Sequence, residues 1–197
     1  MIETLGAALL AIIGRWGYVG LALLMTFESA CIPLPSEIIM PFAGYLVFTG
    51  AMSITGATLA GTAGCVIGSL IAYAIGAGGG RTWLERHGRY LLIQKADLDW
   101  ADQWFTRHGD ATVFVGRLLP VVRTFIALPA GVSRMNRVRF VLYTAAGSVL
   151  WCLGLVLIGA HLGQKWQSLA PYFHRFDVLI AALGVLGVVL YVRRHWR

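Results

Sequence analysis

Residues 27–37 read Phe-Glu-Ser-Ala-Cys-Ile-Pro-Leu-Pro-Ser-Glu, and they place two carboxylates, Glu28 and Glu37, on either side of Pro33 and Pro35. The residues around this stretch are almost all apolar. A proline inside a helix removes a backbone hydrogen bond and kinks or ends the helix. We therefore predict that an apolar helical run breaks at these prolines and turns back, with charged groups held at the break.

The composition of the chain indicates an integral membrane protein. Of its 197 residues, 58% are hydrophobic and only 13% are charged, and the mean hydropathy is +0.72. A soluble domain is about one-quarter charged, so we expect a single membrane domain over residues 1–197. The net charge of +7 is scattered among apolar runs rather than gathered on a basic face, which argues against nucleic-acid binding. A bias of basic residues toward cytoplasmic loops explains it better.

Two apolar runs have the length of ordinary membrane-spanning helices. Ile54–Gly79 and Phe140–Leu162 each exceed the 20 or so residues that a bilayer requires. A further run, at about 177–192, predicts a C-terminal transmembrane helix that ends in a basic tail, which we place in the cytoplasm. Whether Leu5–Phe27, which Arg15 interrupts, crosses the membrane is left open.

Two other apolar runs contain prolines and predict re-entrant helical hairpins. Ala30–Phe48 is interrupted by Pro33, Pro35 and Pro41, and Ala111–Val132 holds Pro120. Backbone groups freed at membrane depth must be buried in protein or line a wet cavity. Each run is therefore expected to enter the bilayer halfway and return.

The chain also contains an internal repeat, from about 15–80 to about 107–163. Corresponding positions are Arg15-Trp-Gly17 and Arg107-His-Gly109, Pro33 and Pro120, Gly44 and Gly131, and Gly76 and Gly159. The proline and hairpin-glycine pairs are 87 residues apart and the Gly76 pair is 83 apart. Chance matching among abundant alanine and glycine is the alternative. Because each repeat makes one full crossing, the second is expected to be inverted relative to the first, with an amphipathic cytoplasmic segment at about 81–106 between them.

Four charges in the two broken runs are candidates for the functional site. Arg117 and Arg123 flank Pro120 as Glu28 and Glu37 flank the first prolines. A charge at bilayer depth costs at least about 2.5 kcal/mol, so these groups must share a paired or wet environment. One interpretation is two structural Glu–Arg pairs that hold the hairpins together. The other is an anion site on the arginines, which suit phosphate oxygens, with glutamates that exchange protons.

The two motifs resemble those of the DedA family. The first is the stretch 27–37 followed by Ala43-Gly44; the second is Gly116-Arg-Leu-Leu-Pro-Val-Val-Arg-Thr124, followed by Pro129-Ala-Gly131. The resemblance covers nearly the whole chain. It implies a multi-pass protein of the bacterial inner membrane, in the same superfamily as the VTT-domain scramblases, with two re-entrant loops. It also implies proton-dependent lipid transport and assigns the acidic and basic pairs to the site.

We therefore expect a transporter that moves a phosphate-headed lipid, foremost undecaprenyl phosphate, between leaflets. Its headgroup would bind Arg117 and Arg123, with Glu28 and Glu37 coupling transport to protons. Pro33, Pro35, Pro120, Gly44 and Gly131 would shape the hairpins. The alternatives are a phospholipid flippase, for instance for phosphatidylethanolamine, a proton-coupled exporter of a small cation, or a scaffolding factor. We expect no enzyme, metal or cofactor, since no histidine lies in either motif and the three cysteines are scattered. The sequence is compatible with a homo-oligomer and does not define the oligomeric state.

Overall fold

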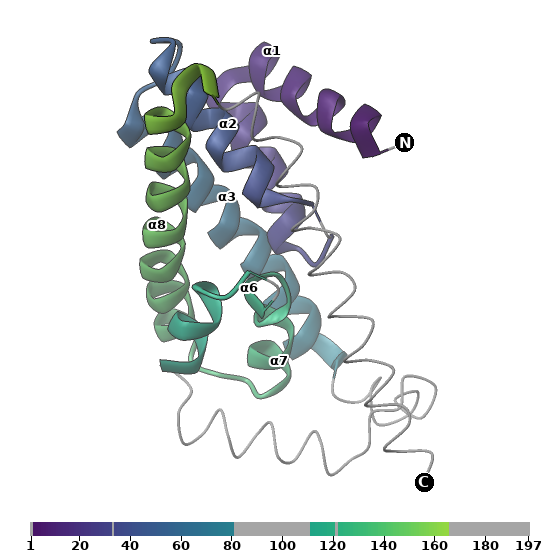
Figure 1. Ribbon diagram of the computed structural model, residues 1–197. Helices are drawn as coiled ribbons and strands as arrows, with labels where there is room; N and C mark the ends of the chain where they lie inside the picture. The colour runs from purple at the N-terminus through teal and green to yellow at the C-terminus, as the bar shows by residue number, and fades with distance from the viewer. Residues whose placement is uncertain (1, 33, 81–110, 121, 166–197) are drawn as a thin grey trace, which may run out of the picture.

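The computed structural model describes residues 2–32, 34–80, 111–120 and 122–165, and within these ranges it is helical with no strand (Figure 1). Three helices are long and apolar enough to cross a membrane, over Leu9–Ser29, Ile54–Gly79 and Arg137–Leu162. Both predicted spans are therefore confirmed as helices long and apolar enough to cross, and the first apolar run supplies a third candidate. Pro33, the segment at 81–106 and the run at 177–192 lie outside the described residues.

The helices α3 (Ile54–Ile75) and α8 (Arg137–Leu162) run antiparallel through the length of the protein (Figure 1). The side chain of Ser53 caps α3 by accepting a hydrogen bond from the Gly56 amide, at 3.0 Å, and α3 continues into the π-helix η1 (Gly76–Gly80). The C-terminal turn of α8 leads into the short 3₁₀ helix η3 (Gly163–Lys165).

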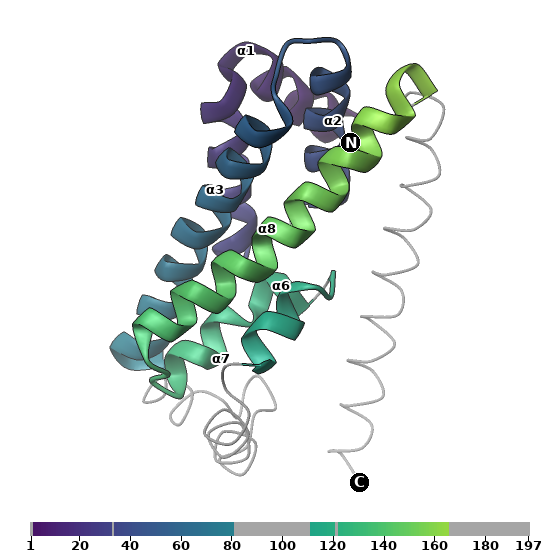
Figure 2. The same ribbon diagram turned by 90° about the vertical axis from the view of Figure 1, so that its left-hand side faces the viewer.

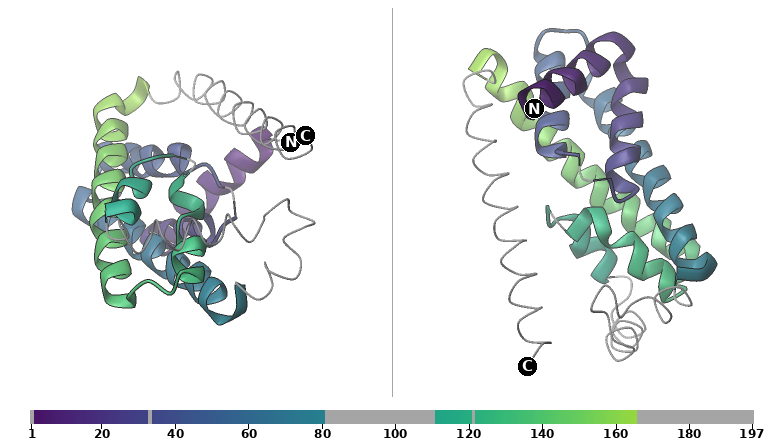
Figure 3. Two further views of the ribbon diagram at one scale, coloured as in Figure 1. Left: turned by 90° about the horizontal axis from the view of Figure 1, so that it is seen from below. Right: turned by 90° about the vertical axis from the view of Figure 1, so that its right-hand side faces the viewer.

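The first helix, α1 (Ile2–Ser29), is kinked at Gly17, whose backbone has a positive φ of 56°. Its N-terminal part projects away from the bundle, and its C-terminal part runs along α3 (Figures 1 and 3). A Cβ atom on Gly64 would lie 2.2 Å from the carbonyl oxygen of Ala22, and one on Gly68 would lie 2.1 Å from that of Thr26. The glycines of α3 therefore allow the backbone of α1 to approach closely.

The first proline-containing run breaks at its start rather than in its middle. The helix α1 ends at Ser29, and α2 (Ser36–Phe48) begins directly after Pro35 and continues through Pro41. Proline is tolerated at a helix start, where the missing amide has no intrahelical partner to lose. The prediction that Pro41 interrupts the run is wrong. The arm that precedes the break is the C-terminal half of α1.

The second proline-containing run consists of short helices. Residues 111–117 are helical, residues 118–120 form a turn that contains Pro120, and α6 (Val122–Phe125) and α7 (Ala127–Val132) follow. These short helices lie at the end of the bundle where α8 begins (Figures 2 and 3), and α7 packs against α3. The predicted break at Pro120 is confirmed.

Each proline-containing run packs against a long helix through a glycine. A Cβ atom on Gly44 of α2 would lie 2.2 Å from the carbonyl oxygen of Val156 in α8. One on Gly131 of α7 would lie 2.2 Å from the carbonyl oxygen of Tyr73 in α3. Both glycines predicted to shape the hairpins are therefore at helix crossings where no side chain fits.

Candidate functional site

The site is centred on a buried ion pair between Glu28 and Arg123. Nη2 of Arg123, in α6, lies 3.1 Å from Oε2 of Glu28, in the last turn of α1, and the two residues are 2% and 1% exposed. The same oxygen accepts a hydrogen bond from the hydroxyl of Ser29, at 3.0 Å, and Oε1 accepts one from Thr124, at 2.8 Å. Both oxygens of Glu28 are thus satisfied, as a buried carboxylate requires.

Arg123 has two further neighbours from the long helices. Its Nη2 lies 3.6 Å from Sγ of Cys65 in α3, and its guanidinium carbon lies 4.9 Å from the ring centre of Trp151 in α8. A guanidinium over an indole is stabilised by the ring quadrupole. However, Nε and Nη1 of Arg123 are buried without a hydrogen-bond partner in the described part of the chain.

Arg117, at the end of the helix over 111–117, is 1% exposed and has no carboxylate partner among the described residues. Its Nη2 donates to the hydroxyl of Ser69 in α3, and that hydroxyl donates to the carbonyl of Cys65. Its Nε and Nη1 have no partner within the described ranges. A Cβ atom on Gly147 of α8 would lie 2.6 Å from Cβ of Arg117. This glycine therefore makes room for the arginine.

Glu37 lies in the first turn of α2 and is half-buried. Its Oε2 accepts a hydrogen bond from Ser36, at 3.3 Å, and it makes no ion pair with any residue that the structure describes. The structure thus brings Glu28, Arg117 and Arg123 into the protein interior. Among the residues that the structure describes, Glu37 has no ion-pair partner, and Glu28–Arg123 is the one Glu–Arg pair formed by these four side chains.

Among the described residues, the fully buried charged groups at the site carry one more positive than negative charge. Arg117 and Arg123 carry two positive charges, and Glu28 carries the one fully buried negative charge beside them. Four guanidinium nitrogens lack partners in the described region. Burying an unsatisfied polar group costs about 1–3 kcal/mol, and more when it is charged. A ligand that offers several anionic oxygen acceptors would satisfy these nitrogens.

Comparison with known proteins identifies the family. The VTT domain matches residues 34–161, most of the chain. The chain belongs to the DedA family. It is 36% identical over 175 residues to undecaprenyl phosphate transporter A of Bacillus subtilis, covering 89% of this chain and 86% of that protein. It is 34% identical to a protein of Lactococcus lactis subsp. cremoris named alkaline phosphatase-like protein, covering 95% and 92%. Protein DedA of Escherichia coli is 26% identical, covering 97% and 89%. No solved structure matches.

The prolines and glycines of the DedA motifs have distinct structural positions. Pro35 is the N-cap of α2, and Pro120 lies in the turn before α6. Gly44 and Gly131 lie at the helix crossings described above. Pro33 is outside the described residues.

The polar and aromatic residues that support the arginines were not identified from the sequence. Ser69 and Cys65 are four residues apart in α3, so they lie on the same face of that helix. Trp151 is a large aromatic residue inside a membrane span. A serine within an apolar helix indicates weakly that its face meets something polar, but it does not identify Arg117 as that partner.

Proposed function

We propose that this DedA protein moves a phosphate-headed lipid, most specifically undecaprenyl phosphate, between the leaflets of the bacterial inner membrane. The relative from Bacillus subtilis is named for transport of undecaprenyl phosphate, as is one from Staphylococcus aureus that is 32% identical to this chain. A lipid phosphate is an anion on a long apolar tail, so its headgroup requires a polar site inside the bilayer while its tail does not.

The observation that carries the proposal is the environment of Arg117. The guanidinium is almost fully buried, its partner is a neutral hydroxyl, and two of its nitrogens have no partner in the described part of the protein. A structural arginine in the interior is normally neutralised by a carboxylate. An arginine left in this state is suited to a transient anionic ligand that brings its own negative charge and oxygen acceptors.

The glutamates would couple this site to protons. In the present arrangement Glu28 neutralises Arg123. A phosphate bound to Arg117 and Arg123 would replace that carboxylate and leave it without its positive partner, so that it takes up a proton. Glu37, which is half-buried and unpaired among the described residues, would exchange that proton with water.

The short helices support the proposal that both proline-containing runs are re-entrant. The helix α2 has 13 residues, so at 1.5 Å per residue it is about 20 Å long, whereas a bilayer core is about 30 Å thick. The second run, over 111–132, is divided into still shorter helices. Neither α2 nor any helix of the second run is long enough to cross the membrane alone, so each run is expected to turn back within it.

The glycine contacts support inverted repeats. Gly44 lies against Val156, and Gly131 lies against Tyr73. The two glycines are 87 residues apart in the sequence, and the two residues that they contact are 83 apart. Each repeat thus places its hairpin against the long helix of the other repeat, at the same two offsets that align the sequences. Exchange of equivalent contacts is what a pseudo-two-fold axis requires.

A second pair of contacts, each formed within one repeat, also occupies equivalent positions in the two repeats. A Cβ atom on Gly64 would lie 2.9 Å from Cβ of Met25, and one on Gly147 would lie 2.6 Å from Cβ of Arg117. Gly147 follows Gly64 by 83 residues, and Arg117 follows Met25 by 92, the offset that relates Gly17 to Gly109. Arg117 therefore occupies the position that the apolar Met25 occupies in the first repeat, and the anion site departs from the repeat symmetry.

The direct test is transbilayer movement of fluorescent undecaprenyl phosphate in proteoliposomes. We expect Arg117→Gln to abolish movement, because glutamine lacks the charge and the planar fork, while Arg15→Gln, which removes an exposed arginine of α1, leaves it unchanged. Melting temperatures of both variants establish that they fold. Unaltered movement in folded Arg117→Gln would contradict the assignment of the site.

Competition in the same assay distinguishes the alternatives. Unlabelled undecaprenyl phosphate should compete; effective competition by phosphatidylethanolamine would favour a general phospholipid flippase, and competition by small cations would favour an exporter. The name of the Lactococcus lactis relative raises an enzymatic alternative, which release of inorganic phosphate from the lipid would support. We expect movement without phosphate release.

A further inference from the structure

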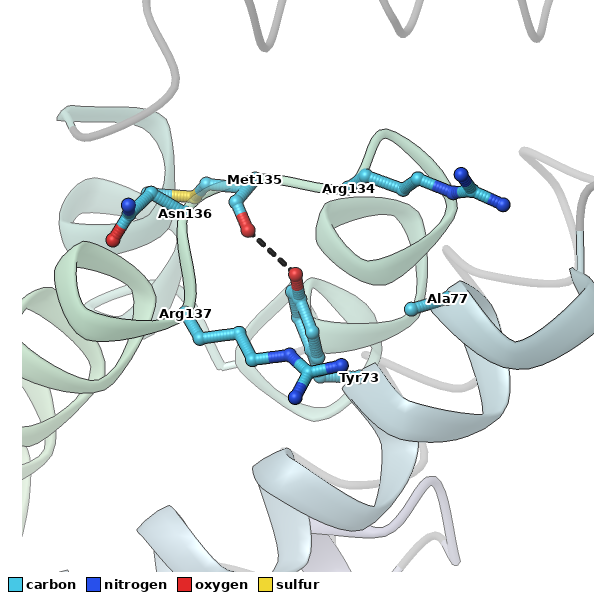
Figure 4. A pocket seen from close by; sticks show the side chains of 6 residues that line it. All are labelled: Tyr73, Ala77, Arg134, Met135, Asn136 and Arg137. Atoms are coloured by element: carbon cyan, nitrogen blue, oxygen red, sulfur yellow. Dashed lines mark hydrogen bonds between the residues drawn. The ribbon is translucent and has the colours of Figure 1, made fainter.

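A second polar feature lies outside the buried site, at the end of the bundle where α3 finishes and α8 begins. A pocket of about 390 Å³ opens there, and it is lined by Tyr73, Ala77, Arg134, Met135, Asn136 and Arg137 (Figure 4). Among the described residues, the hydrogen bonds and the ion pair of Glu28 and Arg123 involve none of these six. Of the described residues that line the pocket, two are arginines and none is a carboxylate.

The pocket is held in shape by the residues that form its floor. The hydroxyl of Tyr73, in the last turn of α3, donates to the backbone carbonyl of Met135 (Figure 4), and the Tyr73 ring lies 4.8 Å from that of Phe140 in α8. The close contact between Gly131 and Tyr73 fixes the preceding helix, α7, against the same residue. The loop that carries Arg134 is therefore attached to α3 at both of its ends, so the pocket exists before any ligand binds.

The charges at the pocket favour an anion. Arg134 and Arg137 are exposed, and neither guanidinium group makes a hydrogen bond or ion pair with any residue that the structure describes. Arg137 is the first residue of the 26-residue helix α8, whose N-terminus carries a partial positive charge. The side chain of Asn136 caps that helix by accepting from the amides of Val138 and Arg139. The guanidiniums are thus left as the free donors.

The surroundings of the pocket indicate a lipid as the source of that anion. Val138 and Leu142 are 68% and 62% exposed and follow Arg137 in α8, and Ile75 is 61% exposed at the end of α3. These side chains belong to helices that are apolar enough to cross a membrane, and Val138 directly follows Arg137 in α8. Free cationic groups at the boundary of a lipid-facing surface are at the depth of phosphate headgroups.

We propose that this pocket binds the phosphate group of an anionic membrane lipid whose acyl chains lie along the apolar surface of α3 and α8. The site is distinct from the buried arginines, and it does not rest on the transport function proposed above. Arg134 and Arg137 would hold the phosphate from two sides, and the pocket volume accommodates a small polar headgroup.

The test is lipid binding by the full chain in detergent, followed by native mass spectrometry during titration with phosphatidylglycerol or with zwitterionic phosphatidylcholine. We expect tighter binding of phosphatidylglycerol, and a rise of about tenfold or more in its half-saturation concentration when Arg134→Gln and Arg137→Gln are combined. The double change to lysine should restore part of the affinity. Arg15→Gln, which removes a distant exposed arginine, should leave binding unchanged.

The titration is repeated in an Arg117→Gln background, where the component that depends on Arg134 and Arg137 should persist, since it does not involve the buried site. In a second experiment, inorganic phosphate is added to the protein with bound phosphatidylglycerol. If it displaces phosphatidylglycerol at equal concentration, the pocket is a site for free phosphate rather than for lipid. Unchanged phosphatidylglycerol binding in the folded double glutamine variant would overturn the proposal.

Discussion

Glu28 and Glu37 stand on either side of the same proline-containing break, but their environments differ. Glu28 is paired with Arg123 and accepts hydrogen bonds on both oxygens. Glu37 is half-buried, and of the described side chains its neighbour Ser36 donates to it. We expect Glu28→Gln to lower the free energy of unfolding by about 3–5 kcal/mol, because it leaves a buried guanidinium without its carboxylate. Glu37→Gln should change it by less than about 1 kcal/mol.

Thermal unfolding in detergent, with the two variants measured side by side, checks this difference. If both glutamines destabilise the protein equally, Glu37 has a structural partner in the folded protein, and its role as the exchanging carboxylate is wrong. A transport assay across a pH gradient then separates the roles. Glu37→Gln should remove the dependence of transport on the gradient while the protein remains folded.

At the residue scale, the identity of the charged groups was predictable and their pairing was not. Charges that flank prolines in apolar runs are too costly to be incidental, which is why Glu28, Arg117 and Arg123 were identified. The spacing of the motifs suggested equivalent glutamates and equivalent arginines. The pairing depends on Ser69, Thr124 and Trp151, which come from three different helices and carry no charge that would mark them in the sequence.

At the scale of helices, the glycines of α8 provide a matched comparison. A Cβ atom on Gly159 would lie 2.0 Å from the carbonyl oxygen of Pro41 in α2, whereas one on Gly154, in the same helix, would meet nothing within 4 Å. We expect Gly159→Ala to destabilise the protein by about 1–3 kcal/mol, since a backbone must shift. Gly154→Ala should stabilise it by up to about 1 kcal/mol through helix propensity.

Melting temperatures of the two alanine variants, measured in one detergent, check this prediction. Equal stability of the variants would mean that α2 does not approach α8 through Gly159. Because Gly44 lies on the opposite side of the same crossing, Gly44→Ala should resemble Gly159→Ala.

The kink in α1 provides a second matched pair. Gly17 has φ 56° and ψ −130°, a conformation that L-residues rarely adopt and that costs about 1–3 kcal/mol. Gly14 has open space around it and its φ is not positive. We expect Gly17→Ala to destabilise the protein by roughly that amount and Gly14→Ala to be neutral or mildly stabilising. Thermal unfolding measures both. Neutral behaviour of Gly17→Ala would show that α1 is straight in the membrane.

The elements show where sequence patterns lose precision. Length and hydropathy were sufficient to predict α3 and α8 from the sequence, because a helix long enough to span a membrane is specified by composition over many residues. Proline marked the break before α2 but was misleading at Pro41, since a proline inside a helix is compatible with continued helix when neighbouring elements cover the freed carbonyl. The kink at Gly17 was not predicted, because one glycine in an apolar run looks like any other.

On the scale of the whole molecule, the proposed repeat symmetry does not extend to the proposed anion site. The contacts of Gly44 and Gly131 obey the symmetry, and so do those of Gly64 and Gly147. The side chains at the site do not, because Arg117 stands where the first repeat has Met25. Under the proposed inverted repeats, both halves would share one framework. Arg117, the charge proposed to bind the anion, belongs to the second half.

An inverted framework requires that the two ends of α3 face opposite sides of the membrane. The loop before α3 contains the exposed Ala51, and the exposed Arg137 lies at the other end of the bundle (Figure 1). In a background with Cys31, Cys65 and Cys152 replaced by serine, a membrane-impermeant maleimide should label Ala51→Cys in intact cells. Arg137→Cys should be labelled only after permeabilisation, because arginine-rich loops remain cytoplasmic. Labelling of both from one side would exclude a full crossing by α3, and labelling in the reverse sense would invert the orientation while leaving the crossing intact.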